Sequence, residues 1–387
     1  MSLDEIKEYL LDDDELTNEE RFDLYYSEHK REQRKKERKK LERGAKPIDK
    51  IMKELGLAGI NPLLTLGSFL FGKFAPQKKA ALESKIAADN LEGNEVLQLI
   101  DYPAFFEMMS IPLPADMSGI LDKLIEENLV AFDSGRYSVT NLGAILFAKQ
   151  LNKFPSLKRK SIRVIIYDGK NKVNTIKEQN GIKGYANGFE GLISWINDQL
   201  PENEVIGQAL RSKVKMYPEI AIIHQDFEMK GTNPMIEIFD DRIEITNNGK
   251  PLVDPLRFIG ATPRSRNEEL ASFMRRLNIC EERGSGIIKV VDAVEIFQLP
   301  PPDFLVDDFH TIAKLYAYRP LNEMDKKDKI RACYQHTCLK HFSGERMSNK
   351  SLRKRFEISD KNYPMASRII SDTIEAGLIK DFDPSSN

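Results

Sequence analysis

The sequence Gly284-Ser285-Gly286, directly before the apolar stretch that begins at Ile287, has the residue types of a phosphate-binding loop. Glycine has no side chain, so its backbone N–H groups can approach a ligand closely. A helix that starts at this point adds unpaired N–H donors and the positive end of its dipole. The loop is therefore a candidate cofactor site, although the ordinary start of a structural helix explains the same residues equally well.

Two further segments carry candidate cofactor-binding residues. The first is the tight turn Asn247-Asn248-Gly249, which tolerates positive φ and can present backbone and side-chain amides to a ligand. The second is a loop before a predicted helix, where arginines can pair with phosphate, and it contributes Arg264, Arg266 and Asn267. A plain hairpin turn and a solvated loop are the alternatives.

A zinc site is suggested by Cys333, His336, Cys338 and His341. A continuous helix turns by about 100° per residue, which puts the first two side chains on one side and the last two on another. Four ligands on such a helix cannot converge in a tetrahedron. The spacing therefore predicts no metal site.

Acid–base chemistry is suggested by His224 and Asp226, but no nucleophile accompanies them. The sequence contains no Ser-His-Asp set, P-loop or metalloprotease motif. We therefore predict no catalytic residue, and we interpret His224 as structural.

The elements that must position the candidate loops form an α/β region over residues 156–320. Apolar runs predict strands at residues 161–168, 172–178, 235–241, 242–249 and 309–318. Helical spacing predicts helices at residues 188–200 and 268–279 and after Gly286.

A winged helix is predicted over residues 93–155. Apolar residues recur at helical spacing from Ile120 to Leu129, and a hairpin signal follows at Ser134-Gly135. In a winged helix the helix before the hairpin enters the major groove of DNA, and here it would be residues 115–128. Packing or protein contacts are the alternative use of this fold.

A helix-turn-helix is predicted over residues 323–387, with helices at 326–342, 349–357 and 365–380. Its exposed candidates for DNA binding are Lys350, Arg353, Lys354, Arg355, Lys361, Ser367 and Arg368. A solvated helix face explains any single one of them as well.

Residues 1–46 form a charged helical arm, and residues 47–92 are a helical and apolar segment that the pattern leaves unassigned. The basic run of the arm can neutralise phosphates on a nucleic acid without sequence specificity. A solvated helix is the alternative. The residues chosen as DNA contacts are Lys35, Lys36, Arg38 and Lys39.

The composition is that of a multi-domain globular protein. The chain has 387 residues, a net charge of -2 and three cysteines, so a disulfide framework is excluded and a reducing cytoplasm is predicted. No apolar run is long enough for a transmembrane helix, and the acidic N-terminus does not resemble a signal peptide.

The order of three segments carries more information than any one of them. These are NNGKP, then PRSRNEELASFMRRL, then ICEERGSGI. Together they resemble the GHKL-type ATP-binding domain of a family of bacterial transcriptional regulators, which is itself similar to the C-terminal part of RecG-type helicases. The resemblance covers roughly residues 93–383 and implies a GHKL-like α/β sandwich that binds ATP. The family's AlbA-like (Schlafen-type) domain is not evident in residues 1–90.

A second departure concerns the family's catalytic helix. That helix carries a glutamate that activates water and, four residues later, an asparagine that holds magnesium. Here Tyr217-Pro218-Glu219-Ile220-Ala221-Ile222 runs directly into Ile223-His224-Gln225-Asp226. About two helical turns are missing, so neither a magnesium ligand nor a water-positioning base is predicted.

Three hypotheses follow. The first is a DNA-binding transcriptional regulator with a GHKL-type nucleotide-binding domain that does not hydrolyse ATP. The second is an ATPase that couples hydrolysis to DNA binding, and the third is a non-enzymatic oligomeric scaffold. The fold class is α/β (α+β), the expected cofactor is ATP without an evident magnesium site, and the expected partners are DNA and further copies of the chain.

Overall fold

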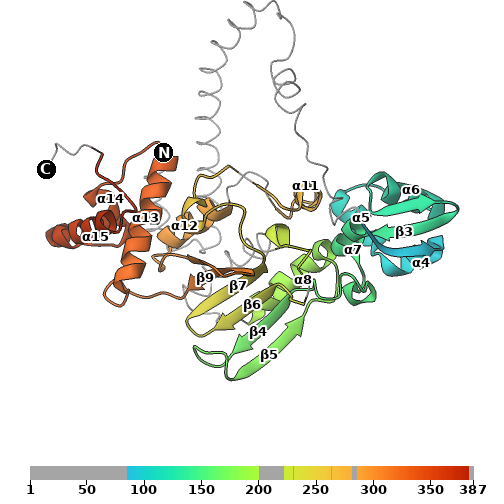
Figure 1. The fold of residues 1–387 in the computed structure, drawn as a ribbon, viewed down its shortest axis with the longest axis horizontal. Coiled ribbons are helices and arrows are strands. Elements are labelled where there is room, and N and C mark those ends of the chain that lie inside the picture. Colours follow the sequence, from blue (N-terminus) through green and yellow to red (C-terminus); the bar gives the residue numbers. More distant parts are fainter. Residues whose placement is uncertain (1–84, 200–221, 230, 263, 281–285, 383–387) are drawn as a thin grey trace, which may run out of the picture. The chain divides into compact units, whose positions relative to one another are not determined.

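The computed structural model describes residues 85–199, 222–229, 231–262, 264–280 and 286–382 (Figure 1). The chain divides into two units, residues 1–80 and residues 81–387, and every described residue belongs to the second unit. The predicted basic arm lies outside the described residues. Among the described helices, none combines the length and the apolar character needed to cross a membrane.

The described chain begins with a helical unit that we call the N-terminal module, residues 86–147. Its elements are β1 (Ile86–Leu91), α4 (Gly93–Leu99), α5 (Tyr102–Met109), α6 (Met117–Glu126), β2 (Val130–Asp133), β3 (Arg136–Thr140) and α7 (Asn141–Phe147). The strands form an antiparallel sheet in the order β1-β3-β2. Three helices, α4, α5 and α6, therefore precede the β2–β3 hairpin.

The hairpin between β2 and β3 turns at Ser134 and Gly135, with φ of 51° and 81°. Two positive φ values are what a two-residue type I′ hairpin requires, and its twist matches that of the flanking strands. Asp133 and Arg136 form the last cross-strand pair before the turn. The hairpin predicted at this position is confirmed.

Next comes a unit that we call the sheet domain, residues 163–316. Its elements are β4 (Arg163–Tyr167), β5 (Thr175–Asn180), α8 (Tyr185–Asp198), β6 (Met235–Phe239), β7 (Arg242–Asn248), η3 (Pro255–Arg257), α11 (Glu268–Arg276), α12 (Gly286–Ile296), β8 (Asp303–Val306) and β9 (His310–Tyr316). The strand order is β5-β4-β6-β7-β9-β8, and β4 and β6 are parallel while the other neighbours are antiparallel. Figure 1 shows β5, β4, β6, β7 and β9 in this sequence. The mixed α and β composition agrees with the predicted fold class.

The two faces of this sheet differ because side chains alternate along each strand. One face contributes buried apolar residues to the core, namely Val164, Ile236, Ile238, Ile243, Ile245 and Leu315. On the other face Glu237 and Glu244 lie opposite each other and are buried. Lys172 lies 2.7 Å from Glu237, and Lys314 lies 2.9 Å from Glu244. These cations offset the repulsion between the two carboxylates.

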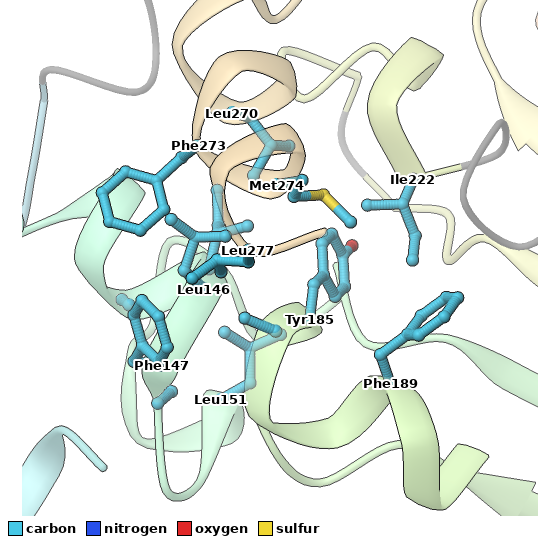
Figure 2. Packing of buried hydrophobic residues seen from close by; sticks show 14 of the residues in the cluster. Leu146, Phe147, Leu151, Tyr185, Phe189, Ile222, Leu270, Phe273, Met274 and Leu277 are labelled. Atoms are coloured by element: carbon cyan, nitrogen blue, oxygen red, sulfur yellow. The ribbon is translucent and has the colours of Figure 1, made fainter. Parts of the chain in front are cut away.

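Helix α11 presents its apolar stripe to the core. Leu270, Phe273, Met274 and Leu277 recur at the three- and four-residue spacing that places side chains on one helical face. Figure 2 shows these side chains among residues from other elements: Leu146, Phe147, Leu151, Tyr185, Phe189 and Ile222. The N-terminal module and the sheet domain therefore share one continuous apolar core.

The last unit, which we call the C-terminal module, spans residues 326–375. It consists of α13 (Lys326–Phe342), α14 (Asn349–Arg355), the short turn η4 (Asp360–Asn362) and α15 (Tyr363–Glu375). The Asp325 side chain caps α13 by accepting the N–H of Asp328, and Ser348 and Ser351 form a capping box at α14. This module has a core of its own, made of Met324, Ala332, Cys333, Leu352, Phe356, Ala366 and Ile369.

Candidate functional site

The turn after β7 occupies the centre of the candidate cofactor site. Gly249 has a φ of 98°, a conformation that side-chain-bearing residues adopt at a cost. A Cβ atom at this position would lie 2.8 Å from the Cβ atom of Asp226. Glycine is therefore required both by the backbone conformation and by the close approach of residues 222–229.

Residues 223–226 are held against this turn by backbone and side-chain hydrogen bonds. The N–H of Asp226 donates to the carbonyl of Asn248 at 2.7 Å. The buried side chain of Asn267 donates to two carbonyls, those of Ile223 at 2.7 Å and Gln225 at 2.9 Å. Asn267, which directly precedes α11, therefore fixes residues 223–225.

Arg266 links the same segment to the turn. Its Nη1 donates to Asp226 Oδ2 at 2.6 Å, and its Nη2 donates to the carbonyl of Lys250 at 2.7 Å. Its buried Nε has no acceptor among the described residues. The carboxylate of Asp226 is thus neutralised by a guanidinium, in the strong class of charge-assisted hydrogen bonds.

Several buried oxygen atoms around the turn have no donor within the described chain. These atoms are Oδ1 of Asn247, Oδ1 of Asn248, Oε1 of Gln225 and Oγ1 of Thr232. Most buried polar atoms in folded proteins are hydrogen-bonded, so unpaired acceptors point to a partner such as water or a ligand. The chemistry that suits them is a ligand with N–H or O–H donors.

Two titratable side chains border the segment. Although His224 is exposed, partial loss of hydration lowers its pKa. The positive charge of the Arg266 guanidinium lowers the pKa of His224 further. The buried Lys160 donates to the carbonyl of Met229 at 2.7 Å. Burial lowers the pKa of Lys160, and the charge of Asp226 opposes that effect.

The structure brings together five of the nine predicted cofactor-binding residues: Asn247, Asn248, Gly249, Arg266 and Asn267. Arg264 is exposed on the loop before α11, and Gly286 is the first residue of α12. Gly284 and Ser285 lie outside the described residues. Asp226 and Lys160 also lie at the site, although neither was among the predicted cofactor-binding residues. Asp226 could have been identified from the Ile-His-Gln-Asp segment, whereas nothing in the sequence distinguishes Lys160 from its basic neighbours.

The described part of the site suits a nucleotide better than a magnesium ion. At Gly249 no side chain blocks the approach of a ligand to the backbone. Buried acceptors without a donor among the described residues lie beside it. Magnesium requires hard oxygen ligands, usually carboxylates, and the Asp226 carboxylate is bound by Arg266. Within the described residues, no group of three or more His, Cys, Asp or Glu side chains is arranged to hold a metal ion.

The four residues considered for zinc lie on α13 and have other surroundings. His336 is buried, with Nδ1 2.9 Å from Glu295 Oε2 and Nε2 3.1 Å from Ser351 Oγ. Cys333 lies in the core of the C-terminal module, and burial raises the pKa of the Cys338 thiol. His341 is exposed near the end of the helix.

The predicted DNA contacts of the C-terminal module fall into two groups. Exposed side chains are those of Lys350, Lys354, Lys361, Ser367 and Arg368. Arg353 is largely covered and pairs with Asn349 and Asp360. The prediction that Arg355 is exposed is wrong, because only 4% of this residue is exposed and it donates to the carbonyl of Leu299 at 2.7 Å. The contacts predicted in the arm lie outside the described residues.

Helix α6, the DNA-reading helix of the predicted winged helix, has an acidic surface. Asp122 and Glu126 are exposed, and the one lysine of the helix, Lys123, lies 2.6 Å from Glu126. Asp116 caps the helix by accepting the N–H of Gly119. This surface repels phosphate, in contrast to the basic surface of the C-terminal module.

Comparisons with known proteins bear on the sheet domain. Residues 231–313 match the family described as "Putative ATP-dependent DNA helicase recG C-terminal". This match spans the turn at Asn247–Gly249, the loop of Arg264–Asn267 and the glycine-rich loop. The chain therefore contains a RecG-like ATPase-type domain. No curated protein matches the chain.

One similar solved structure is that of the DIP2311 protein from Corynebacterium diphtheriae. The two share 13% sequence identity with a TM-score of 0.48, over 75% of this chain and 51% of that chain. The chain thus spans about half the length of that protein.

Proposed function

We propose that this protein is a DNA-binding regulator whose ATPase-type domain binds ATP without hydrolysing it. The observation that carries the proposal is the state of the candidate site. Its described carboxylate, Asp226, is ion-paired with Arg266 at 2.6 Å, while the acceptors around the turn remain unpaired. The described part of the site therefore has places for a nucleotide's donors and, among its described residues, no free carboxylate for metal-dependent chemistry.

Nucleotide binding is supported by the family match and by the chemistry of the turn. An adenine ring offers an exocyclic amino group, and a ribose offers hydroxyls, so both can donate to the unpaired oxygens of Asn247 and Asn248. Lys250 and the exposed Arg264 lie on the loops beside the turn and can interact with phosphate oxygens. These residues are therefore proposed as the binding set, together with Gly284, Ser285 and Gly286 of the glycine-rich loop.

The absence of hydrolysis follows from what the reaction requires. An attacking water needs a positioned base, and a triphosphate bound with magnesium needs an oxygen ligand for the ion. The sequence has no Glu-x-x-x-Asn pattern before Ile223, and Asp226 cannot serve as a free base while Arg266 holds it. ATP would then act as a bound effector that is not hydrolysed.

DNA binding is proposed for the C-terminal module. Lys350, Lys354, Lys361 and Arg368 give its α14–α15 surface four exposed cations. Cations of this kind displace counterions from DNA phosphates and supply most of the non-specific affinity. A regulator that binds two half-sites would do so as a homo-oligomer, and its three cysteines suit the reducing cytoplasm.

Isothermal titration calorimetry tests the nucleotide proposal on the full chain, with ATP added in the presence and absence of magnesium and with phosphate release assayed in the same samples. We expect binding that does not depend on magnesium and no phosphate release. Gly249→Ala should abolish binding, because the added Cβ meets Asp226 at 2.8 Å.

A matched control is Gly231→Ala. Gly231 also has a positive φ of 89°, but an added Cβ there meets nothing within 4 Å. Its backbone strain is comparable, so its ATP affinity should stay near that of the natural chain. Turnover of ATP by the natural chain would replace this proposal with the ATPase hypothesis.

A further inference from the structure

The C-terminal module meets the sheet domain through a polar junction. We use this name for the contacts of Arg331, Tyr334, Gln335, His336 and Arg355 with Leu256, Glu295, Leu299 and residues 301–303. The apolar core of the module and that of the sheet domain are separate clusters. Polar contacts between domains exchange readily with water, so they allow relative motion.

Helix α13 supplies most of these contacts. The Tyr334 hydroxyl donates to the carbonyl of Leu256, and Gln335 Nε2 donates to the carbonyl of Pro302 at 2.9 Å. Arg331 lies 3.6 Å from Asp303. Each such hydrogen bond contributes only about 1 kcal/mol net, because water replaces it when the surfaces separate.

At the centre of the junction, Glu295 of α12 lies between two side chains of the C-terminal module. Its carboxylate oxygens are 3.0 and 2.9 Å from Nδ1 of His336. Arg355 Nε is 3.6 Å from Glu295 Oε1, too far for a hydrogen bond. A single carboxylate of the sheet domain therefore binds both α13 and α14.

Arg355 is incompletely satisfied in this position. Its side chain is 1% exposed, and its Nε and Nη1 have no acceptor within the described part of the chain. Burial lowers the pKa of Arg355, and the charge of Glu295 only partly offsets that effect. A buried cation with unpaired donors carries a desolvation cost, which separation of the junction would remove.

The candidate cofactor site is connected to this junction by the chain between residues 249 and 256. Lys250 accepts a hydrogen bond from Arg266 at the site. Six residues later, Leu256 in η3 accepts the hydroxyl of Tyr334. A phosphate group bound by the Lys250 side chain would shift this segment, and with it Leu256, while Arg266 stays paired with Asp226.

We propose that the C-terminal module docks reversibly at the polar junction and that nucleotide binding at the turn after β7 releases it. This inference rests on the nucleotide binding proposed above and states how that binding affects the C-terminal module. The basic α14–α15 surface would then change its position relative to the rest of the protein in response to ATP. In this way a site without hydrolysis could still control DNA contacts.

Hydrogen–deuterium exchange on the full chain tests the inference, read by mass spectrometry with and without ATP in EDTA. Calorimetry under the same conditions establishes whether ATP is bound. We expect bound ATP to accelerate exchange in peptides that cover α13, and to leave the β2–β3 hairpin unchanged. Bound ATP without a change in α13 would overturn the inference and leave the proposed function standing, whereas absence of binding would overturn both.

Two variants test the junction without nucleotide. Glu295→Gln leaves Arg355 buried without a counter-charge, which is strongly destabilising for a broken buried pair, so exchange in α13 should rise by roughly tenfold or more. The double variant Glu295→Gln with Arg355→Met removes both charges and should restore the exchange rate of the natural chain. Unchanged exchange in the single variant, with the fold intact at β2–β3, would show that this junction does not hold the module.

Discussion

The N-terminal and C-terminal modules attach to the same sheet domain by different kinds of contact. The N-terminal module shares its core with the sheet domain: Phe147 of α7 and Phe273 of α11 have ring centroids 6.0 Å apart, in an edge-to-face arrangement. Gly184, just before α8, approaches α7 so closely that an added Cβ would lie 2.4 Å from the carbonyl oxygen of Leu146. The C-terminal module keeps its own core and meets the domain through hydrogen bonds and charges.

The difference between the two attachments has a physical consequence. Separating the N-terminal module would expose apolar surface, at about 25 cal/mol for each Å². Separating the C-terminal module would mainly exchange protein hydrogen bonds for water, at a much smaller net cost. The first module is therefore attached by apolar packing, and the second by contacts that exchange more readily with water.

The exposed side chains of the two modules also differ in charge and polarity. The N-terminal module exposes the acidic helix α6 and apolar side chains such as Met117 and Phe132. The C-terminal module exposes several lysines and Arg368. The DNA binding that we propose thus belongs to the module with the polar attachment, whereas the N-terminal module has a surface closer to that of a protein contact.

The largest effect is expected for Phe273→Ala, which removes a buried ring from the core that the N-terminal module and the sheet domain share. Truncation of a buried phenylalanine costs about 3–5 kcal/mol, and both the sheet domain and the N-terminal module should lose stability together. Denaturant unfolding followed by circular dichroism measures this as a lower midpoint. The control is Phe342→Ala, since Phe342 is 48% exposed and its loss should change stability by about 0.5 kcal/mol or less. Separate unfolding of the N-terminal module at low denaturant would contradict the shared core.

A second prediction concerns the charge difference between the modules. Replacing Lys350, Lys354, Lys361 and Arg368 by alanine should lower the slope of log affinity against log salt by about 3 to 4, since each phosphate contact contributes about 0.9. Fluorescence anisotropy with a 30-base-pair duplex of arbitrary sequence measures the slope. Lys123→Ala on α6 is the control and should leave it unchanged. A loss of affinity in the Lys123 variant alone would move DNA binding to the N-terminal module.

The same comparison shows what sequence alone could predict. Helix α13 occupies the residues predicted for it, because its charged ends and its cap at Asp325 are local signals. The strands β1 and β8 were not predicted. β1 has the sequence IAADNL, with only one β-branched residue, and β8 is a four-residue edge strand directly after three prolines. Their pairing with β3 and β9 is a tertiary effect that overrides local propensity.

The candidate site was predictable in its parts and not in its connections. The turn at Asn247–Gly249 and the loop at Arg266 are visible in the sequence, but the pairing of Arg266 with Asp226 joins residues 40 positions apart. Arg355 is an instructive error. Leu352 and Phe356 mark the buried face of α14, and Arg355 lies three residues after Leu352 on that face. Helical spacing could therefore have identified Arg355 as buried.

The smallest effect is expected at the ion pair between Arg276 of α11 and Glu127 at the end of α6. Both nitrogens of the Arg276 guanidinium terminus lie 2.5 Å from the Glu127 carboxylate, but the two side chains are 42% and 24% exposed. Exposed pairs of this kind contribute about 0.2–1 kcal/mol.

Arg276 also lies over the Phe273 ring, with its guanidinium carbon 5.0 Å from the ring centroid, so Arg276→Ala alone would remove packing as well as charge. A double-mutant cycle with Glu127→Ala isolates the ionic contribution, because the lost packing appears in both arms of the cycle and cancels. Thermal or denaturant unfolding of the four proteins should give a coupling energy below about 1 kcal/mol. A coupling above about 2 kcal/mol would mean that charge, and not the shared apolar core, fixes the N-terminal module to the sheet domain. The two attachments would then differ in strength and no longer in kind.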